Sequence, residues 1–427
     1  MKKLLIIFLL FPFLISAQEK VKIGVLFDSL KTHPTIQSDN LNMEMALAGK
    51  RIVDSKLFPR INLFGQFDYS NSPNGMKPLV PNEMFPMIKD QSIPQPFSER
   101  IYRAGAVGSM PIFVKSIFTL GSKTKMLYKS AKAKKYINLL QNEAVIVITN
   151  SNLTYLNNLE KALLKKKKSL EKTKEIINIK VNNGRAPASA LLIINNAINQ
   201  IDININNIAI NKENAFKVIT SLTGLKLKDA VKINLIGNYE EGAIRALDPI
   251  KQKVEADRLG LRAEKEKLWP VLVLNGNYNH SYAKAYNNNL TVNEDFATVA
   301  LTLSLPLFAM DKYANIEKSK LEYETTKNEM NKLSLDLRSK ATQLKNSYPL
   351  ILNSINLYKK SIKDKEEILR IAKVSYTSGR ISIEDYLKYE DDLVLEESNL
   401  YKAQTDKMQT IMKLAVIYGN NIEDIVK

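Results

Sequence analysis

Hydrophobic and polar residues alternate along two short stretches of the chain, residues 61–69 and 298–305. One side of the first stretch carries Ile61, Leu63, Gly65, Phe67 and Tyr69. In the second stretch, valine and leucine share one side, and the other side is rich in threonine and serine. A period of two predicts β-strands with one apolar face. A weaker alternation over residues 103–113, which contain Gly105 and Gly108, predicts another strand.

Longer stretches follow a helical pattern. Residues 37–56, 122–181 and 188–222 are predicted helices, and the second has neither proline nor glycine in it. About 60 residues at about 1.5 Å each give a rod of roughly 90 Å. Isoleucine and asparagine alternate within 190–212, as in a strand. The heptad spacing nevertheless favours a coiled-coil helix, through Ile194, Ile198, Ile201, Ile205 and Ile208.

A sharp turn joins consecutive long helices. Gly379-Arg380 ends one periodic segment, at a residue that tolerates the left-handed conformation. Ser382 can cap the next helix, and Asp385 stands where a capping box places its acid. The same turn occurs 195 residues earlier at Gly184-Arg185, where Pro187 replaces Ser382 and suits a first helical turn.

The order strand, strand, long helix, turn, helix occurs twice. The proline before the first strand of each pair recurs at an offset of 211, from Pro59 to Pro270. From Pro111, which matches Pro306, the offset is 195, so the first loop between strands is 16 residues longer. Residues 18–36 carry no readable pattern. The predicted repeats are about residues 37–224 and 248–419 of one protomer that spans residues 18–427.

The longer loop, from Asn71 to Arg100, holds six of the fifteen prolines. Proline removes a backbone donor and disfavours the interior of helices and strands. We therefore predict an irregular, solvent-exposed loop here, with neither a helix nor a strand interior.

Four strands cannot complete a membrane structure within one chain. They are too few to close a barrel, and open sheet edges are not tolerated in lipid. Strands of about ten residues with this alternation are typical of outer-membrane barrels. We therefore predict a mainly α fold with a small β part. It consists of internally duplicated, long coiled-coil helical hairpins and four membrane strands per chain, and several copies share one barrel.

The beginning of the chain predicts export. Lys2-Lys3 precedes an apolar run over residues 4–15, and Ser16-Ala17 offers a cleavage point, so residues 1–17 are interpreted as a signal peptide. No later run of eighteen apolar residues follows, so no membrane-spanning helix is expected.

Composition narrows the function classes further. The chain has no cysteine and two distant histidines, which argues against a thiolate–histidine metal site. The formal charge of +18 suits a nucleic-acid partner, but an exported chain without a nucleic-acid-binding motif argues against one. No phosphate-binding loop, nucleophile elbow or metal-ligand cluster is present. We predict no enzyme activity and no cofactor.

With its two repeats and paired turns, the chain resembles the TolC family of outer-membrane efflux proteins. The stretch from Gly379 to Leu387 is similar to the family's G-x-x-S-x-x-D-x-L motif. The resemblance implies a homotrimer, with a twelve-stranded barrel in outer-membrane lipid and a twelve-helix barrel in the periplasm. An equatorial belt is expected near residues 225–248 and the chain ends. The implied function is a passive duct for efflux or type I secretion, which docks a periplasmic adaptor and an inner-membrane pump.

The resemblance also implies roles for the tips. Tyr376 and Asp385 correspond to residues of the channel constriction, although Ile381 replaces the family's arginine and Lys388 its second aspartate. The residues expected to contact the adaptor are Gly184, Arg185, Leu192, Gly379, Arg380, Ser382 and Leu387. Each role has an alternative. Asp385 would be only an acid that favours the first helical turn, and Tyr376 would only pack at a helix end. Arg185 and Arg380 would be only solvated charges.

Two other features have simpler readings. Residues 165–168 are four consecutive lysines, interpreted as a solvated helix face. Trp269 is interpreted as an aromatic residue at the barrel rim. The rival function is a periplasmic coiled-coil adaptor or scaffold without a barrel, which has no need of four alternating strands.

Overall fold

The computed structural model describes residues 22–427. The expected signal peptide, residues 1–17, lies outside the described residues. The chain divides into two compact units. The hairpin unit comprises the described residues up to Asp39 together with Lys135–Ala246 and Leu335–Lys427, and the sheet unit comprises Asn40–Lys134 and Leu247–Ser334.

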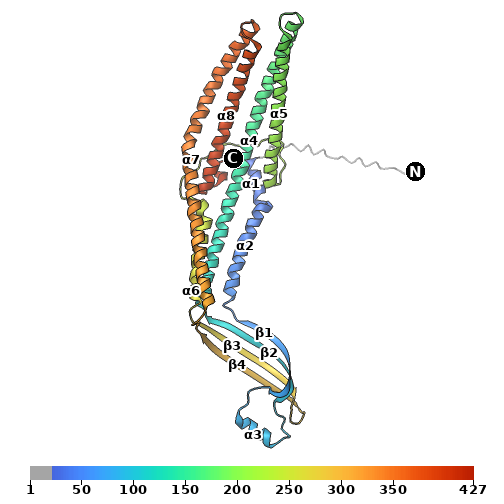
Figure 1. The fold of residues 1–427 in the computed structure, drawn as a ribbon, viewed down its shortest axis with the longest axis vertical. Coiled ribbons are helices and arrows are strands. Elements are labelled where there is room, and N and C mark those ends of the chain that lie inside the picture. The colour runs from blue at the N-terminus through green and yellow to red at the C-terminus, as the bar shows by residue number, and fades with distance from the viewer. Residues whose placement is uncertain (1–21) are drawn as a thin grey trace, which may run out of the picture. The chain divides into compact units, whose positions relative to one another are not determined.

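Two long helical hairpins contribute most of the helix (Figure 1). The first is α4 (Lys115–Asn182) with α5 (Ala188–Thr223), and the second is α7 (Met310–Thr377) with α8 (Ile383–Tyr418). Both first helices have 68 residues and both second helices have 36. Each element of the second hairpin begins 195 residues after its counterpart. The internal duplication of helical hairpins is confirmed.

The heptad prediction for residues 190–212 is also confirmed, because α5 is helical throughout. Ile194, Ile201 and Ile208 lie seven residues apart and are at most 4% exposed. They share one core cluster with Leu163 and Leu170 of α4. Ile203 and Ile210, two residues after Ile201 and Ile208, are exposed, so the local alternation with asparagine does not mark two sheet faces.

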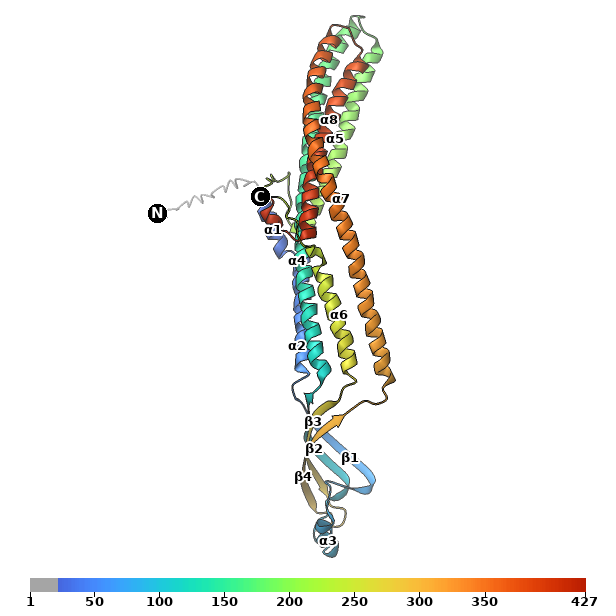
Figure 2. The same ribbon diagram turned by 90° about the vertical axis from the view of Figure 1, so that its left-hand side faces the viewer.

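The sheet unit holds four antiparallel strands in the order β1-β2-β3-β4 (Figure 2). They are β1 (Arg60–Gly75), β2 (Phe97–Phe113), β3 (Val271–Lys284) and β4 (Thr291–Ser304). The sheet unit also contains helix α6 (Asp248–Glu266) and part of α2 (Pro34–Ser55). The 3-10 turn η1 (Arg245–Leu247) spans the boundary between the two units in the sequence. Among the described residues, β1 and β4 each pair with a strand on one side only.

The proline-rich loop is more ordered than the sequence predicts. It contains the helix α3 (Pro81–Lys89), β1 continues to Gly75, and β2 already begins at Phe97. Pro81 occupies the first turn, where no backbone donor is needed. The side chain of Asn287, from the loop between β3 and β4, donates to the carbonyls of Gln91 and Ile93. Contacts distant in sequence therefore organise a segment that its prolines alone would leave irregular.

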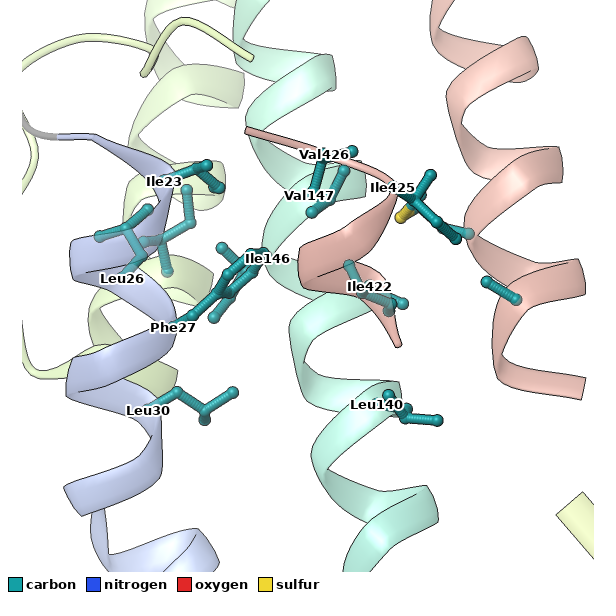
Figure 3. Close-up of a cluster of buried hydrophobic side chains, with 14 of the residues drawn as sticks. Ile23, Leu26, Phe27, Leu30, Leu140, Ile146, Val147, Ile422, Ile425 and Val426 are labelled. Carbon is teal, nitrogen blue, oxygen red and sulfur yellow. The ribbon is translucent and has the colours of Figure 1, made fainter. Parts of the chain in front are cut away.

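The segment over residues 18–36, which has no readable pattern, contains α1 (Ile23–Thr32) and the start of α2. Leu26, Phe27 and Leu30 of α1 are buried in a cluster with residues of α4 and of the C-terminal segment (Figure 3). This terminal cluster includes the following labelled partners: Leu140, Ile146, Val147, Ile422, Ile425 and Val426.

The C-terminal segment is fixed to the loop that follows α5. It contains the 3-10 turn η2 (Ile422–Asp424). Asn234 and Lys427 exchange two backbone hydrogen bonds of 2.8 and 3.0 Å. The chain end and part of the 225–248 segment therefore meet within the hairpin unit.

No helix within residues 22–427 combines the length and apolarity required to cross a membrane.

Glu143 of α4 is a charged group buried beside the terminal cluster. It is 1% exposed, and its Oε2 atom has no hydrogen-bond partner. Burial, with a further contribution from Glu423, raises its pKa to about 7, although Lys31 opposes the shift. Lys31 and Glu423 form an ion pair of 2.7 Å between α1 and η2. The terminal cluster thus covers a carboxyl group that is easier to bury when protonated.

This burial predicts that the terminal cluster weakens as the pH rises. Opening returns Glu143 to water, where its pKa is near 4.5. Because the pKa of Glu143 is higher in the closed cluster than in water, binding of a proton favours the closed cluster. This stabilisation is complete below about pH 4.5 and is lost as the pH rises through 7. The loss should be on the order of 2–3 kcal/mol.

Hydrogen exchange of the α1 amides at pH 5 and pH 8, corrected for intrinsic rates, measures the effect. Glu143→Gln should largely abolish the difference between the two pH values. Glu175→Gln, at an exposed position of the same helix, should leave it unchanged. Equal pH dependence in all three proteins would contradict the assignment to Glu143.

Candidate functional site

At both predicted tips, the two helices are joined by a turn with the same backbone geometry. Gly184 and Gly379 have φ angles of 66° and 78°. After each glycine, the arginine amide donates to a carbonyl five residues back, at 2.7 Å in the first tip and 2.8 Å in the second. A Cβ atom at either glycine would have open space around it, so glycine is required by the backbone and not by crowding. Arg185 and Arg380 are exposed beside these turns.

The second tip has the predicted capping box, and the first does not. Ser382 Oγ accepts from the Asp385 amide at 3.1 Å and donates to Asp385 Oδ2 at 2.9 Å. Asp385 Oδ2 also accepts from the Ser382 amide at 3.4 Å. The sequence suggests that Pro187 lies in the first turn of α5, but it lies one position earlier, at the N-cap. Its side chain makes no capping hydrogen bond. Asp385 is exposed, so its cap contacts leave its charge open to solvent.

Tyr376 lies where three helices of the hairpin unit meet. Its ring stacks on that of Tyr386 with centroids 5.3 Å apart and an angle of 19°. Lys180 of α4 places Nζ 5.4 Å from the Tyr376 centroid. Burial raises the pKa of Tyr376, so its hydroxyl stays protonated at neutral pH. Tyr376 therefore bridges α7 to both α4 and α8.

A buried polar layer continues from this stack, and the sequence alone does not reveal it. Tyr386 is 1% exposed and Glu390 is 5% exposed. Tyr386 donates to Glu390 Oε1 at 2.5 Å, and Ser169 of α4 donates to the same oxygen at 2.8 Å. Burial, followed by the bond to Glu390, raises the pKa of Tyr386 to about 12. The spacing of Tyr386 and Glu390 by four residues is the one available signal, because it places both on one helix face.

The lysine run over residues 165–168 is not uniformly solvated, which corrects the sequence interpretation. The Lys166 side chain is 8% exposed and forms an ion pair with Asp391 of α8. Lys167 forms an ion pair of 2.6 Å with Asp202 of α5. The run therefore meets two other helices, and part of its charge is neutralised between them. A cavity of about 340 Å³ adjoins this place and is lined by Lys165, Lys166, Ser169, Arg370 and Glu390, among others.

The two leucines predicted at the tips differ in exposure. Leu387 is 8% exposed and belongs to the hairpin core, whereas Leu192 is 69% exposed. Leu192 is therefore available for a partner, and Leu387 supports the tip from inside.

The sheet has two chemically different faces. The register aligns Leu63, Ala106, Tyr278 and Ala297 across the four strands on one face. The same apolar face carries Ile61, Leu274, Val299, Leu301 and Leu303.

The opposite face of the sheet carries many polar side chains, although Ile101, Ala283 and Val292 form a small buried cluster on it. A groove of about 300 Å³ on it is lined by Arg60, Asn62, Ser109, Asn275, Asn277 and Thr298, among others. Farther along this face, Arg103 pairs with Asp68 at 2.8 Å. An apolar face opposite an amide-rich face suits a wall between lipid and water. Within residues 22–427, no cluster of three or more His, Cys, Asp or Glu side chains could hold a metal ion.

Removal of the Tyr386 hydroxyl should loosen the second tip. Tyr386→Phe leaves buried Glu390 without its shorter hydrogen bond, which should lower the local opening free energy of α8 near the tip by about 1–3 kcal/mol. Hydrogen exchange of the amides over residues 386–394 measures this change. Tyr389→Phe is the matched control, because Tyr389 is 36% exposed, and we expect a change below about 0.5 kcal/mol. Equal effects of the two variants would exclude a specific role for the buried hydroxyl.

The comparisons with known proteins agree with this architecture. Residues 245–420 match the family model described as outer membrane efflux protein. No curated protein matches the sequence.

Solved outer-membrane channels share the fold of most of the chain. The Campylobacter jejuni CmeC outer membrane channel is 17% identical, with a TM-score of 0.76 over 93% of this chain and 85% of that one. The outer membrane protein VceC of Vibrio cholerae is 12% identical, with a TM-score of 0.77 over 93% and 96% of the two chains. The Neisseria gonorrhoeae MtrE outer membrane channel is 15% identical, with a TM-score of 0.74 over 95% and 90%. Residues 245–420 thus match the outer membrane efflux protein family, and the fold agrees with that of solved outer membrane channels, as the resemblance to the TolC family implies.

Proposed function

We propose that three copies of this chain form a passive duct, the outer-membrane channel of a tripartite efflux or type I secretion system. The observation that carries the proposal is a four-stranded sheet with one apolar face, one amide-rich face and two edges unpaired within the chain. Lipid requires every backbone donor and acceptor to be paired. Three sheets joined edge to edge supply twelve strands, enough to enclose a water-filled lumen.

Side-chain exposure on the apolar face supports contact with lipid. Leu63, Val299 and Leu303 are 84%, 79% and 69% exposed in the single chain. The transfer of such a side chain from water to an apolar environment contributes roughly 1.5–3 kcal/mol. A water-soluble scaffold would forgo this free energy at every such position, so the sheet favours the channel over that alternative.

The hairpin unit also has apolar side chains that are exposed in the single chain. Leu350, Leu357 and Ile371 of α7 are 67%, 56% and 53% exposed. They are separated by multiples of seven residues, which places them on one seam of a coiled coil. A helix from a neighbouring copy would bury this seam, as a closed ring of helices in the periplasm requires.

The tips are proposed as the site of opening and docking. Asp385 would line the constriction with one exposed carboxylate per copy, and Tyr376 would help to hold the helices around it. The exposed Gly184-Arg185 and Gly379-Arg380 turns, together with Leu192, would contact a periplasmic adaptor that links the duct to an inner-membrane pump. Ser382 and Leu387 would support that surface through the capping box and the core. Transport through such a duct requires no catalysis and no cofactor in this chain.

Cysteine labelling tests the membrane-spanning role of the sheet. The chain has no cysteine, so one introduced thiol reports on one position. Asn82→Cys, at an exposed position of α3, should react with a membrane-impermeant maleimide on intact cells, because this loop should face outward. Arg185→Cys, at the first tip, should react only after the outer membrane is permeabilised. The reverse pattern, or labelling of both on intact cells, would contradict the proposed topology.

A separate prediction concerns the constriction. Asp385→Asn removes the charge but keeps an oxygen that can accept from the Ser382 amide. In planar bilayers, this variant should show a lower preference for cations and weaker block by multivalent cations. Glu384→Gln removes a neighbouring charge that is also exposed and serves as the control. If both variants retain the original selectivity and block, Asp385 is a helix cap and does not line the pore.

A further inference from the structure

The apolar face of the sheet ends in a row of aromatic rings near the loop that holds α3. Phe67 and Tyr102 have centroids 4.9 Å apart, and Tyr102 and Tyr282 are 6.3 Å apart. The row therefore crosses β1, β2 and β3. Tyrosines in this position are typical of the boundary between the hydrocarbon and the polar headgroups. The row marks where lipid headgroups would begin.

Two cations lie immediately beyond this row on the same face. Arg100 pairs with Tyr69 across β1 and β2, and its guanidinium lies 5.8 Å from the Tyr69 centroid. Lys284 pairs with Thr291 across β3 and β4. The last aligned pair between β2 and β3 is Ile101 with Ala283, so Arg100 and Lys284 are the next residues outward on adjacent strands. Both side chains are exposed.

No acidic side chain within the described part of the chain forms a salt bridge with either cation. The nearest acid on that face, Asp295, is engaged by His280 at 2.9 Å and Tyr278 at 2.8 Å. Glu294 lies on the opposite face and pairs with Lys77 at 2.6 Å. Like charges on adjacent strands are unfavourable without a counter-charge. The arrangement is therefore complementary to an anion from outside the chain.

We propose that Arg100 and Lys284 bind the phosphate of a phosphorylated glycolipid in the outer leaflet, with the Thr291 hydroxyl as an additional donor. This inference rests on the proposed membrane-spanning role of the sheet. Arginine offers a planar fork that matches phosphate oxygens, and lysine adds a compact charge. The acyl chains of the same lipid would lie along the apolar face beside Leu63 and Ala106.

The strand order keeps this site open in an assembly. Neighbouring copies would join at β1 and β4, the two edges of the sheet. Arg100 and Lys284 belong to the central strands β2 and β3 and remain on the lipid side after closure. The apolar side chains below them, interrupted by His280 and Asp295, favour a lipid over a free anion or a soluble acidic protein.

Native mass spectrometry of the detergent-extracted protein tests the site, with diphosphoryl lipid A as the probe. The wild-type assembly should retain lipid A, and Arg100→Gln/Lys284→Gln should weaken its binding by about tenfold or more, since two charge-assisted contacts are lost. Arg60→Gln is the control, because Arg60 is an exposed cation on the opposite, polar face of β1. It should retain wild-type binding.

The outcomes separate this inference from the proposed function. A trimer whose lipid A binding is the same in the double variant overturns the phosphate site and leaves the channel intact. Equal retention of phosphatidylcholine, or full competition by millimolar inorganic phosphate, also overturns it, because the site would then not select a phosphorylated lipid. A protein that is only monomeric in the same spectra overturns the channel and this inference together.

Discussion

The unpaired edges of the sheet are the constraint on which this structure depends. Within residues 22–427, β1 and β4 each have one edge that pairs with no other strand. In water the backbone groups at these edges could bond to solvent, but the exposed leucine and valine side chains of the same strands favour lipid. In lipid, unpaired groups cost several kcal/mol each. Edge-to-edge closure between copies would satisfy both demands.

The two repeats share one backbone plan but have diverged in chemistry at the tips. Both turns use a left-handed glycine and the same pattern of backbone hydrogen bonds. The first tip begins its second helix with Pro187 and an apolar core, whereas the second adds the capping box and the layer around Glu390. Buried polar layers cost free energy when their partners separate. This places most of the elements that could hold or release the tip in the second repeat, while Ser169 and Lys180 of α4 contribute from the first.

The sequence predicts those parts of the fold that local periodicity controls. The isoleucine heptads of α5, the turns at both glycines and the Ser382–Asp385 cap follow from spacing alone. Local periodicity does not predict contacts between residues that are distant in the sequence. The order around α3 depends on Asn287, nearly 200 residues after Gln91, and the burial of Lys166 depends on Asp391, 225 residues away. Without knowledge of these partners, the lysine run is interpreted as solvated and the proline-rich loop as irregular.

Native mass spectrometry in a mild detergent tests the central claim most directly, because it counts the chains that share one barrel. The account predicts one dominant species, with three times the mass of the exported chain and still assembled after extraction from the outer membrane. A stable monomer, or an assembly of any other number of chains, would contradict the shared barrel and the duct built upon it.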